Sequence, residues 1–260
     1  MNWSTKWHTT KPDVSSRAKD SGTLGTHRAS FWTRLFDLMA PRTCAACGER
    51  LAESERQVCT SCLLTLPRTH YARATAWQDN EMARLFWGRV EVERAAAWFF
   101  YRSGTSMSQM VHQMKYHHQP LLARHLGHLA AEEMSADGFF DGVDLLVPVP
   151  LTRRRERQRG YNQSREIARG ISEVTGISMA DRAVIRTRFE ESQTRKSAAE
   201  RMANVEGVFE LTDAAAVAGR HVMLVDDVMT TGATLSACCR QLSAATDIKV
   251  SVFALSFAHG

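Results

Sequence analysis

The chain has 260 residues, of which 44% are hydrophobic, and its formal net charge is +5 at pH 7. No window approaches the roughly 18 continuous apolar residues of a membrane span, and the first residues lack the apolar core of a secretory signal. Composition therefore argues against a membrane-spanning or secreted protein and favours a cytoplasmic one. The positive charge favours an anionic partner, either a polyphosphate substrate or a nucleic acid, without choosing between them.

The N-terminal part of the chain is polar, rich in Ser, Thr and Lys, and without periodicity. We therefore expect residues 1–30 to form a disordered extension that carries no chemistry. Phe31–Met39 could be a short helix that leads into the cysteine-containing segment that follows.

Two CxxC pairs predict a small zinc ribbon over residues 31–67. Cys44 and Cys47 form the first pair, Cys59 and Cys62 form the second, and eleven residues separate them. Tetrahedral Zn²⁺ takes four thiolates, and this segment is too small and charged to fold on an apolar core alone. Disulfides are the alternative, but without an export signal the thiols should stay reduced. The balanced charge of the segment favours a structural zinc over direct contact with nucleic acid.

The remainder, residues 68–260, has the alternating strands and helices of an α/β domain. Residues 68–88 show no interpretable pattern, whereas Val90–Arg102 suggests one or two strands. Apolar spacing predicts helices over Ser106–Lys115, Leu121–Met134 and Ser164–Val174. Further strands are expected at Leu145–Val147, Val184–Ile185, Val208–Leu211, Val222–Val225 and Val250–Phe257, the last of which closes the sheet. Leu145–Val147 and the helix after it open a βαβ unit.

A basic loop is predicted between this strand and helix, over Leu151–Gln163. It contains five arginines, at positions Arg153, Arg154, Arg155, Arg157 and Arg159. The loop leaves the carboxyl end of a sheet strand, which is the edge where open α/β sheets bind ligands. Guanidinium groups fit phosphate oxygens two at a time, so the loop suits a phosphorylated ligand, although a solvated basic loop is the alternative.

The segment His221–Leu235, HVMLVDDVMTTGATL, is the most informative part of the chain. Val222–Val225 is an apolar run typical of a strand that is buried on both faces, and Asp226 and Asp227 follow at its carboxyl end. A Thr/Gly turn then leads into a helix that begins near Ala233. Free N–H groups at a helix start, close backbone approach at Gly232 and nearby threonine hydroxyls suit a phosphate. Carboxylates only accept hydrogen bonds, so their partners would be sugar hydroxyls or hydrated Mg²⁺. Together these groups describe a site for a ribose 5-phosphate.

This segment resembles the binding motif for 5-phosphoribosyl-1-pyrophosphate (PRPP) of the type I phosphoribosyltransferases. The resemblance implies that Asp226 and Asp227 hold the ribose hydroxyls. It also implies that the following loop holds the 5-phosphate, through Thr230, Thr231, Gly232, Ala233 and Thr234. It further implies a type I phosphoribosyltransferase-like fold, with a parallel sheet between helices, and Mg²⁺ bound together with PRPP.

The likeness extends to the ComF/GntX family of phosphoribosyltransferase-like proteins that carry a zinc ribbon. It rests on the paired CxxC motifs, on VPVPLTRRRERQRGYNQ and on SQTRKSAAERMANVEGVF, and it covers nearly everything from Phe31 onward. By that resemblance, a pyrophosphate-side loop includes Arg155, Arg159, Gly160, Asn162 and Gln163. A mobile segment that folds over the ligand includes Gln193, Arg201 and Asn204. His117–His118 departs from the pattern, which usually has Arg and Gly there, and we expect a surface turn rather than a metal site.

Three functional hypotheses remain open. The chain could be a phosphoribosyltransferase that displaces pyrophosphate from PRPP with an unidentified nitrogen acceptor, with the two aspartates in the catalytic site. It could instead bind PRPP as an accessory factor in DNA uptake and natural transformation, the role that the ComF resemblance implies, with its basic loops contacting single-stranded DNA and other uptake proteins as partners. A nucleobase-salvage enzyme is the third possibility. Cys238 and Cys239 are interpreted as small buried residues without a chemical role.

Overall fold

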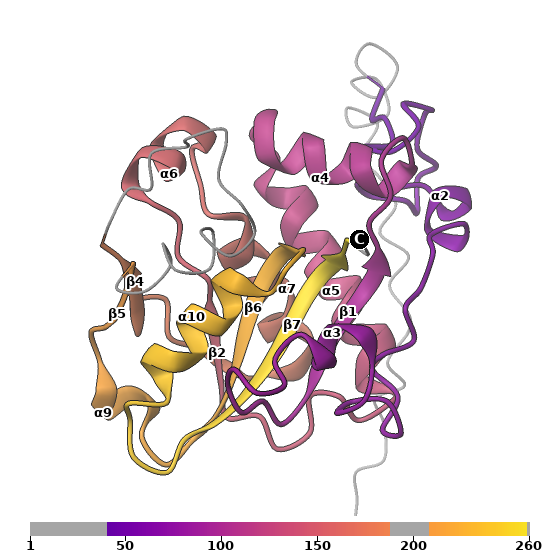
Figure 1. Cartoon of the computed structure of the whole chain (residues 1–260). Helices are drawn as coiled ribbons and strands as arrows, with labels where there is room; N and C mark the ends of the chain where they lie inside the picture. Colours follow the sequence, from indigo (N-terminus) through magenta and orange to yellow (C-terminus); the bar gives the residue numbers. More distant parts are fainter. Residues whose placement is uncertain (1–40, 188–207, 259–260) are drawn as a thin grey trace, which may run out of the picture. The chain divides into compact units, whose positions relative to one another are not determined.

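The computed structural model describes residues 41–187 and 208–258, which include one five-stranded parallel sheet (Figure 1). The strands are ordered β1-β7-β6-β2-β3, and every neighbouring pair runs parallel. Their bounds are Ala95–Phe100 (β1), Leu145–Pro148 (β2), Ser178–Met179 (β3), His221–Met229 (β6) and Lys249–Phe257 (β7). The strand with the two aspartates, β6, is therefore the central one. This sheet confirms the predicted α/β class.

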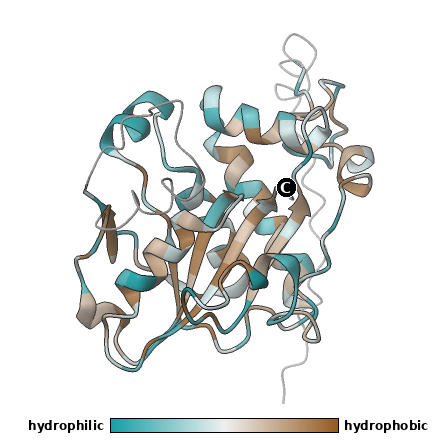
Figure 2. Cartoon of the chain, in the orientation of Figure 1, coloured by the Kyte–Doolittle hydropathy of each residue, from teal (hydrophilic) through white to brown (hydrophobic). Residues whose placement is uncertain are grey.

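Helices cover both faces of the sheet, because apolar side chains of β6 point alternately to the one face and the other. Met223 and Val225 pack in one hydrophobic cluster with α4, α5 and α7, whereas Val222 and Leu224 pack in the other with α3 and α10. The helices are α2 (Thr60–Leu64), α3 (Glu81–Arg84), α4 (Ser106–Tyr116), α5 (Pro120–Ser135), α6 (Arg153–Arg159), α7 (Gln163–Thr175), α9 (Ala214–Val217) and α10 (Ala233–Leu242). Figure 2 shows the strands as mostly hydrophobic and α6 as hydrophilic. No helix in the described part of the chain is long and apolar enough to cross a membrane.

Two glycines allow α5 and α7 to pack backbone against backbone. A Cβ atom on Gly170 of α7 would lie 2.0 Å from the Arg124 carbonyl oxygen of α5. A Cβ atom on Gly127 of α5 would lie 2.2 Å from the Ile167 carbonyl oxygen of α7. Neither position can carry a side chain without moving a helix. This close contact fixes α7, whose amino end reaches the aspartates.

Most predicted elements are confirmed, and the differences have local causes. The expected loop at Leu151–Gln163 is wrong in part, because Arg153–Arg159 form helix α6, which Thr152 caps through its hydroxyl and Gly160 ends with φ 77°. The strand Val222–Val225 continues to Met229 and contains both aspartates. Strands β4 (Val184–Arg186) and β5 (Phe209–Leu211) form a separate antiparallel pair and do not join the main sheet.

Other differences concern segments that the sequence left uninterpreted or that the structure does not describe. Helix α3 lies in the range 68–88, and the side chain of Asn80 caps it by accepting a hydrogen bond from the Ala83 amide over 2.9 Å. Strand β7 lies between β1 and β6 and is not at an edge. The helix expected at Phe31–Met39 and the loop residues Gln193, Arg201 and Asn204 lie outside the described residues.

Candidate ligand site and cysteine cluster

Asp226 and Asp227 lie near the carboxyl end of the central strand β6. Successive side chains of a strand point to opposite faces, so the two carboxylates have different neighbours. Asp226 accepts a hydrogen bond from the Ser164 hydroxyl at 3.0 Å, and its Oδ1 also accepts from the Asp227 amide at 2.9 Å. Ser164 belongs to the first turn of α7. The amino end of α7 therefore lies directly against this acid.

The environment of Asp226 disfavours its charge. Burial, followed by the neighbouring charge of Asp227, raises the pKa of the Asp226 carboxyl to about 7. The hydrogen bonds from the Asp227 amide and Ser164 and the positive charge of Lys115 act in the opposite direction but do not outweigh burial. A cation or a set of hydroxyl donors arriving here would favour the ionised form.

Asp227 is paired with a residue whose side chain the sequence did not place in the site. Its Oδ2 lies 3.2 Å from Nζ of Lys115, and the two side chains are 12% and 21% exposed. Its Oδ1 accepts a hydrogen bond from the Val228 amide at 2.6 Å, and the hydroxyl of Ser256 in β7 donates to its backbone carbonyl. Lys115 stands in the last turn of α4, so that helix ends at the acid pair.

The predicted phosphate loop follows β6 directly. Gly232 has a left-handed backbone with φ 73° and is the N-cap of α10, which begins at Ala233 as predicted. Gly232 has no side chain that could cap this helix, so the amide groups of its first turn face the loop without an acceptor from the N-cap. A Cβ atom on Gly232 would lie 2.9 Å from Cε of Met229. Thr230 and Thr231 are exposed, and Arg89 donates to the Thr231 carbonyl at 3.3 Å.

The basic segment stands on α6, at the end of the sheet toward which the strands point (Figure 1). Arg159 donates to Oε1 of Gln163 at 2.7 Å, and Nε2 of Gln163 donates to the Met114 carbonyl at 3.3 Å. The hydroxyl of Tyr161 donates to the same carbonyl at 2.7 Å. Arg159 is therefore tied to the end of α4, next to Lys115, whereas Arg155 is exposed.

The unusual pair His117–His118 forms an exposed turn, as expected. His118 has φ 50°, the left-handed region that suits the glycine usual in the ComF/GntX pattern. Its Nδ1 donates to the Arg159 carbonyl at 3.1 Å, and its ring packs edge-on against Tyr161. These contacts hold a histidine in a backbone region that glycine fills without strain.

The four predicted metal ligands converge. One ligand atom from each of Cys44, Cys47, Cys59 and Cys62 lies within 4.8 Å of all the others. The Cys47 and Cys59 sulfurs are 3.8 Å apart, and about 3.8 Å is the separation that Zn–S bonds near 2.3 Å give in a tetrahedron. The Cys44 sulfur accepts from the Ala46 and Cys59 amides at 3.4 and 3.3 Å, as a metal-bound thiolate does. These cysteines could hold a metal such as zinc.

The structure thus brings some of the predicted residues together and adds others. The aspartates, the phosphate loop and the amino end of α7 meet at one end of β6. Lys115 and Ser164 join them, and neither residue carries a sequence motif that assigns it to this site. Cys238 and Cys239 are buried in α10, as interpreted, and burial raises the pKa of both thiols.

Sequence comparisons with known proteins point to one family. A family model described as the phosphoribosyl transferase domain matches residues 112–255, from α4 to β7. DNA utilization protein YhgH of Escherichia coli K12 is 29% identical over 196 residues, which cover 74% of this chain and 80% of that protein. Competence protein F of Haemophilus influenzae is 30% identical over 50% of this chain and 58% of its own length. Competence protein ComFC of Bacillus subtilis is 35% identical over 38% of each chain.

Solved structures with partial likeness were also found. One is described as the allosteric regulatory enzyme of purine biosynthesis, with a TM-score of 0.35 and 23% identity over 52% of this chain and 25% of that chain. Another is a hypoxanthine phosphoribosyltransferase from Staphylococcus aureus, with a TM-score of 0.32 and 10% identity over 54% of this chain and 73% of that chain.

The family model spans more than half of the chain and includes the central strand, the phosphate loop and α6. Relatives named as competence proteins are similar to part of the chain as well. The chain therefore belongs to the phosphoribosyl transferase domain family, and the ComF-type resemblance of its motifs is confirmed.

Proposed function

We propose that the chain binds PRPP together with Mg²⁺ at the end of β6 and serves in the cytoplasm as an accessory factor in DNA uptake and natural transformation. The observation that carries the PRPP site is the continuous unit of Asp226, Asp227 and the uncapped amino end of α10 on the central strand. Only a short turn separates the two acids, which suit sugar hydroxyls, from the start of α10, which suits a phosphate. A ribose that bears a 5-phosphate has the matching groups.

The pyrophosphate of PRPP would lie toward α6 and α4. Lys115 forms an ion pair with Asp227, and Arg159 is held through Gln163 at the end of α4. Arg155 is exposed on α6, the helix that also carries Arg159. Bidentate guanidinium groups and a lysine suit an anion that carries several charges.

Mg²⁺ fits the chemistry of this donor set. The two adjacent carboxylates have one nearby ammonium group, that of Lys115. Without a further cation, the pKa of the Asp226 carboxyl is raised to about 7. Magnesium prefers oxygen ligands and usually binds through one or two carboxylates and substrate phosphates. When bound, it would neutralise charge on the pyrophosphate.

The alternative is an active phosphoribosyltransferase with an unidentified nitrogen acceptor. In that reaction the bond from the anomeric carbon to pyrophosphate breaks, a bond to the acceptor nitrogen forms, and the nitrogen loses a proton to solvent. The chain would contribute by fixing the ribose through Asp226 and Asp227 and by placing cations beside the leaving group. The close fit of α4, α7 and β6 around the acids supports this reading as well as simple binding.

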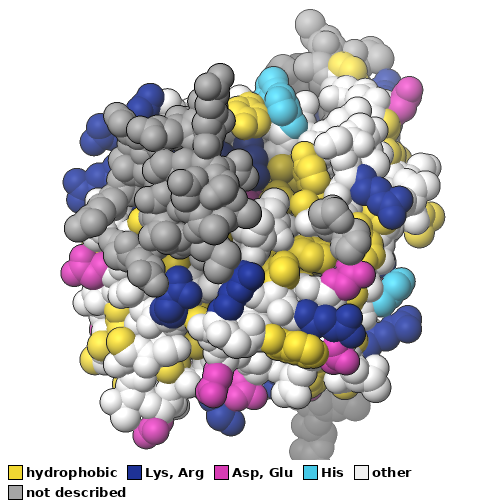
Figure 3. Space-filling view, in the orientation of Figure 1, with side chains coloured by type: hydrophobic (Ala, Val, Ile, Leu, Met, Phe, Trp, Pro, Cys, Tyr) yellow, Lys and Arg dark blue, Asp and Glu magenta, His cyan; other side chains and the backbone are white. Residues whose placement is uncertain are grey.

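The role in DNA uptake is supported by the names of the relatives, among them two competence proteins and a DNA utilization protein. The exposed arginines of α6, Arg153, Arg155 and Arg157, would supply contacts to a single strand. Figure 3 shows Lys and Arg side chains gathered over this helix. Phosphate contacts of this kind are independent of sequence and weaken with salt.

Calorimetric titration of PRPP with Mg²⁺ into the full chain tests the site. We expect binding that the double variant Asp226→Asn, Asp227→Asn loses and that Asp247→Asn, an exposed carboxyl outside the site, retains. Release of pyrophosphate from PRPP in the presence of candidate acceptors would then distinguish transfer from binding. Unchanged PRPP affinity in the double variant would refute the proposed site.

The cellular role needs a separate experiment. A strain that lacks the chain should be transformed less efficiently with purified DNA, and the wild-type chain should restore transformation. If the double aspartate variant restores it equally well, PRPP binding is not required for that role. If deletion leaves transformation unchanged, the proposed role in DNA uptake is wrong.

A further inference from the structure

The segment between α3 and β1 packs against the predicted phosphate loop, residues 230–234. A Cβ atom on Gly232 would lie 3.6 Å from Cβ of Leu85 and 3.9 Å from Cε1 of Phe86. Phe86 is buried, and its carbonyl accepts hydrogen bonds from the amides of Arg89 and Val90 at 3.0 and 3.1 Å. This tight turn holds the backbone of Arg89 beside the loop. The segment precedes residue 112, where the family model begins, so the model does not cover it.

The side chain of Arg89 reaches the loop. Its Nη1 donates to the Thr231 carbonyl at 3.3 Å, although the two residues are 142 positions apart in the sequence. The first backbone hydrogen bond of α10 in the described chain runs from the Ser236 amide to the Gly232 carbonyl at 2.8 Å. The Thr231 carbonyl therefore lies before the hydrogen-bonded turns of the helix, and the guanidinium is its donor.

This hydrogen bond sets the direction of the next amide. In a trans peptide unit the carbonyl and the N–H of the following residue point in opposite directions, and the described chain has no cis peptide bond. Because the Thr231 carbonyl faces Arg89, the N–H of Gly232 points away from Arg89. Gly232 directly precedes the first turn of α10, whose amides suit a phosphate. A cation on the carbonyl also polarises the peptide and makes its N–H a stronger donor.

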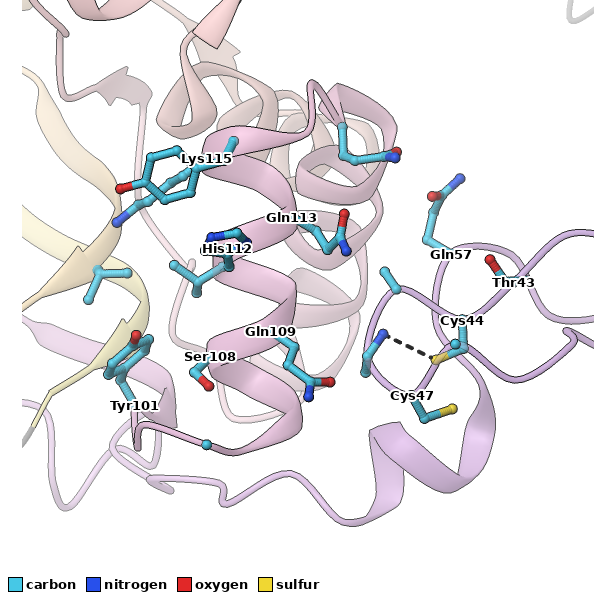
Figure 4. Close-up of a pocket in the computed structure, with 18 of the residues that line it drawn as sticks. Thr43, Cys44, Cys47, Gln57, Tyr101, Ser108, Gln109, His112, Gln113 and Lys115 are labelled. Carbon is cyan, nitrogen blue, oxygen red and sulfur yellow. Dashed lines mark hydrogen bonds between the residues drawn. The ribbon is translucent and has the colours of Figure 1, made fainter.

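Arg89 places a positive charge at a loop that has none of its own. Residues 230–234 include no lysine or arginine, whereas a phosphate monoester carries about two negative charges at neutral pH. Lys115 extends from α4 toward the sheet (Figure 4), and Arg159 stands on α6, so both suit the pyrophosphate end of PRPP. Arg89 instead follows α3, which packs with α10 on the other face of the sheet.

We propose that Arg89 is a positioning residue for recognition of the 5-phosphate. Through the Thr231 carbonyl it orients and polarises the Gly232 N–H, which donates to a phosphate oxygen of the ligand. The inference rests on the proposed function for the identity of the ligand, and it adds a residue that lies outside the family model. The effect of Arg89 is confined to the 5-phosphate end of PRPP.

The first test compares ligands by calorimetry, with the full chain and Mg²⁺. Ribose 5-phosphate needs the loop, whereas pyrophosphate does not. We expect Arg89→Met to weaken the binding of ribose 5-phosphate and of PRPP about tenfold, the order of one hydrogen bond to a charged group, and to leave pyrophosphate affinity unchanged. Arg89→Lys keeps a charge and a donor and should lose less affinity. Because Arg89 is exposed, the unfolding free energy of Arg89→Met should stay close to the wild-type value.

Arg84→Met is the matched control, because it removes the same charge from the same segment. The guanidinium of Arg84 pairs with Asp79 at 2.8 Å and lies over the ring of Trp87, so it is engaged away from the loop. This variant should bind ribose 5-phosphate as the wild type does. Equal losses in Arg84→Met and Arg89→Met would mean that net charge alone acts, and they would overturn the inference.

A spectroscopic measurement reports on the amide itself. The dipeptide Thr–Gly occurs twice in the chain, at residues 175–176 and 231–232, so threonine labelled with ¹³C at the carbonyl and glycine labelled with ¹⁵N select two amide signals. Gly176 donates to the Ser172 carbonyl at the end of α7 and is the internal reference. Saturation with ribose 5-phosphate should shift the Gly232 amide proton downfield in the wild type, and clearly less in Arg89→Met. The Gly176 signal should not respond in either protein.

The two proposals fail in different ways. If neither ribose 5-phosphate nor PRPP binds to the wild type, the proposed function is wrong and this inference falls with it. If both bind and Arg89→Met leaves their affinities and the Gly232 shift unchanged, only this inference is overturned. A loss of pyrophosphate affinity as large as that of ribose 5-phosphate would also overturn it, because the substitution would then disturb the whole site.

Discussion

Asp226→Asn should stabilise the ligand-free chain at neutral pH while it abolishes PRPP binding. Burial and the charge of Asp227 raise the pKa of Asp226 from 3.8 to about 7. Because the pKa of Asp226 is higher in the folded chain than in the unfolded chain, protonation of this carboxyl stabilises the fold. That contribution is complete below pH 3.8 and is fully lost above about pH 7. Between these limits the free energy of unfolding falls by about 4 kcal/mol, at 1.36 kcal/mol for each pKa unit. Asparagine carries no charge and keeps an oxygen to accept from Ser164.

The assay is urea unfolding of both proteins in EDTA, without PRPP or Mg²⁺, from about pH 5 to about pH 8. Asp226→Asn should gain stability relative to the wild type as pH rises, by roughly 3 kcal/mol over that range. Asp247→Asn, on an exposed loop, should show no such gain. A constant difference between wild type and Asp226→Asn across this range would refute the claim that a buried, costly charge sits at the ligand site.

Four other changes test separate parts of the structure. Gly170→Ala should lower the unfolding free energy by about 1–3 kcal/mol, because overpacking outweighs a helix-propensity gain of about 1 kcal/mol. Lys115→Met should destabilise the chain by about 2 kcal/mol, since it leaves Asp227 without its cation in a mostly buried position. Metal analysis should find zinc in the wild type and not in Cys47→Ser, and the melting temperature of that variant should be lower. Arg157→Ala should reduce the slope of log DNA affinity against log salt by about one.

Each of these has its own contrary outcome and control. Gly170→Ala as stable as the wild type would mean that α5 and α7 separate at little cost. Lys115→Arg should retain most of the stability that Lys115→Met loses, and equal loss in both would argue against the ion pair. Wild-type protein without bound zinc would contradict the metal site, and Cys238→Ser, far from the cluster in α10, should leave zinc content unchanged. A DNA affinity that is flat with salt would exclude phosphate contacts by α6.

Regular elements were predictable where the sequence had a clear period. The apolar run of β6 and the helical spacing of α4, α5 and α7 indicate the α/β class. The sequence does not indicate helix α6, because a run of arginines has no apolar face and the helical form depends on the caps at Thr152 and Gly160. Strand propensity does not indicate which strand is the partner, so the sequence alone cannot show that β4 and β5 pair apart from the main sheet.

The candidate site was predictable only where one segment carried it. The acids and the loop are contiguous, so their closeness needed no knowledge of packing. Lys115 and Ser164 come from helices far apart in sequence, and only the docking of α4 and α7 on β6 brings them to the aspartates.

The glycine contacts between α5 and α7 limit how this chain can change during evolution or design. Each helix touches the other's backbone, at Gly127 and at Gly170, so the two cannot slide or rotate without collision. An inserted residue between Ser164 and Gly170 would turn the helix by about 100° and direct either the hydroxyl or the glycine away from its partner. Length variation among relatives should therefore be excluded from this stretch and be tolerated beyond Thr175, where the helix has already ended.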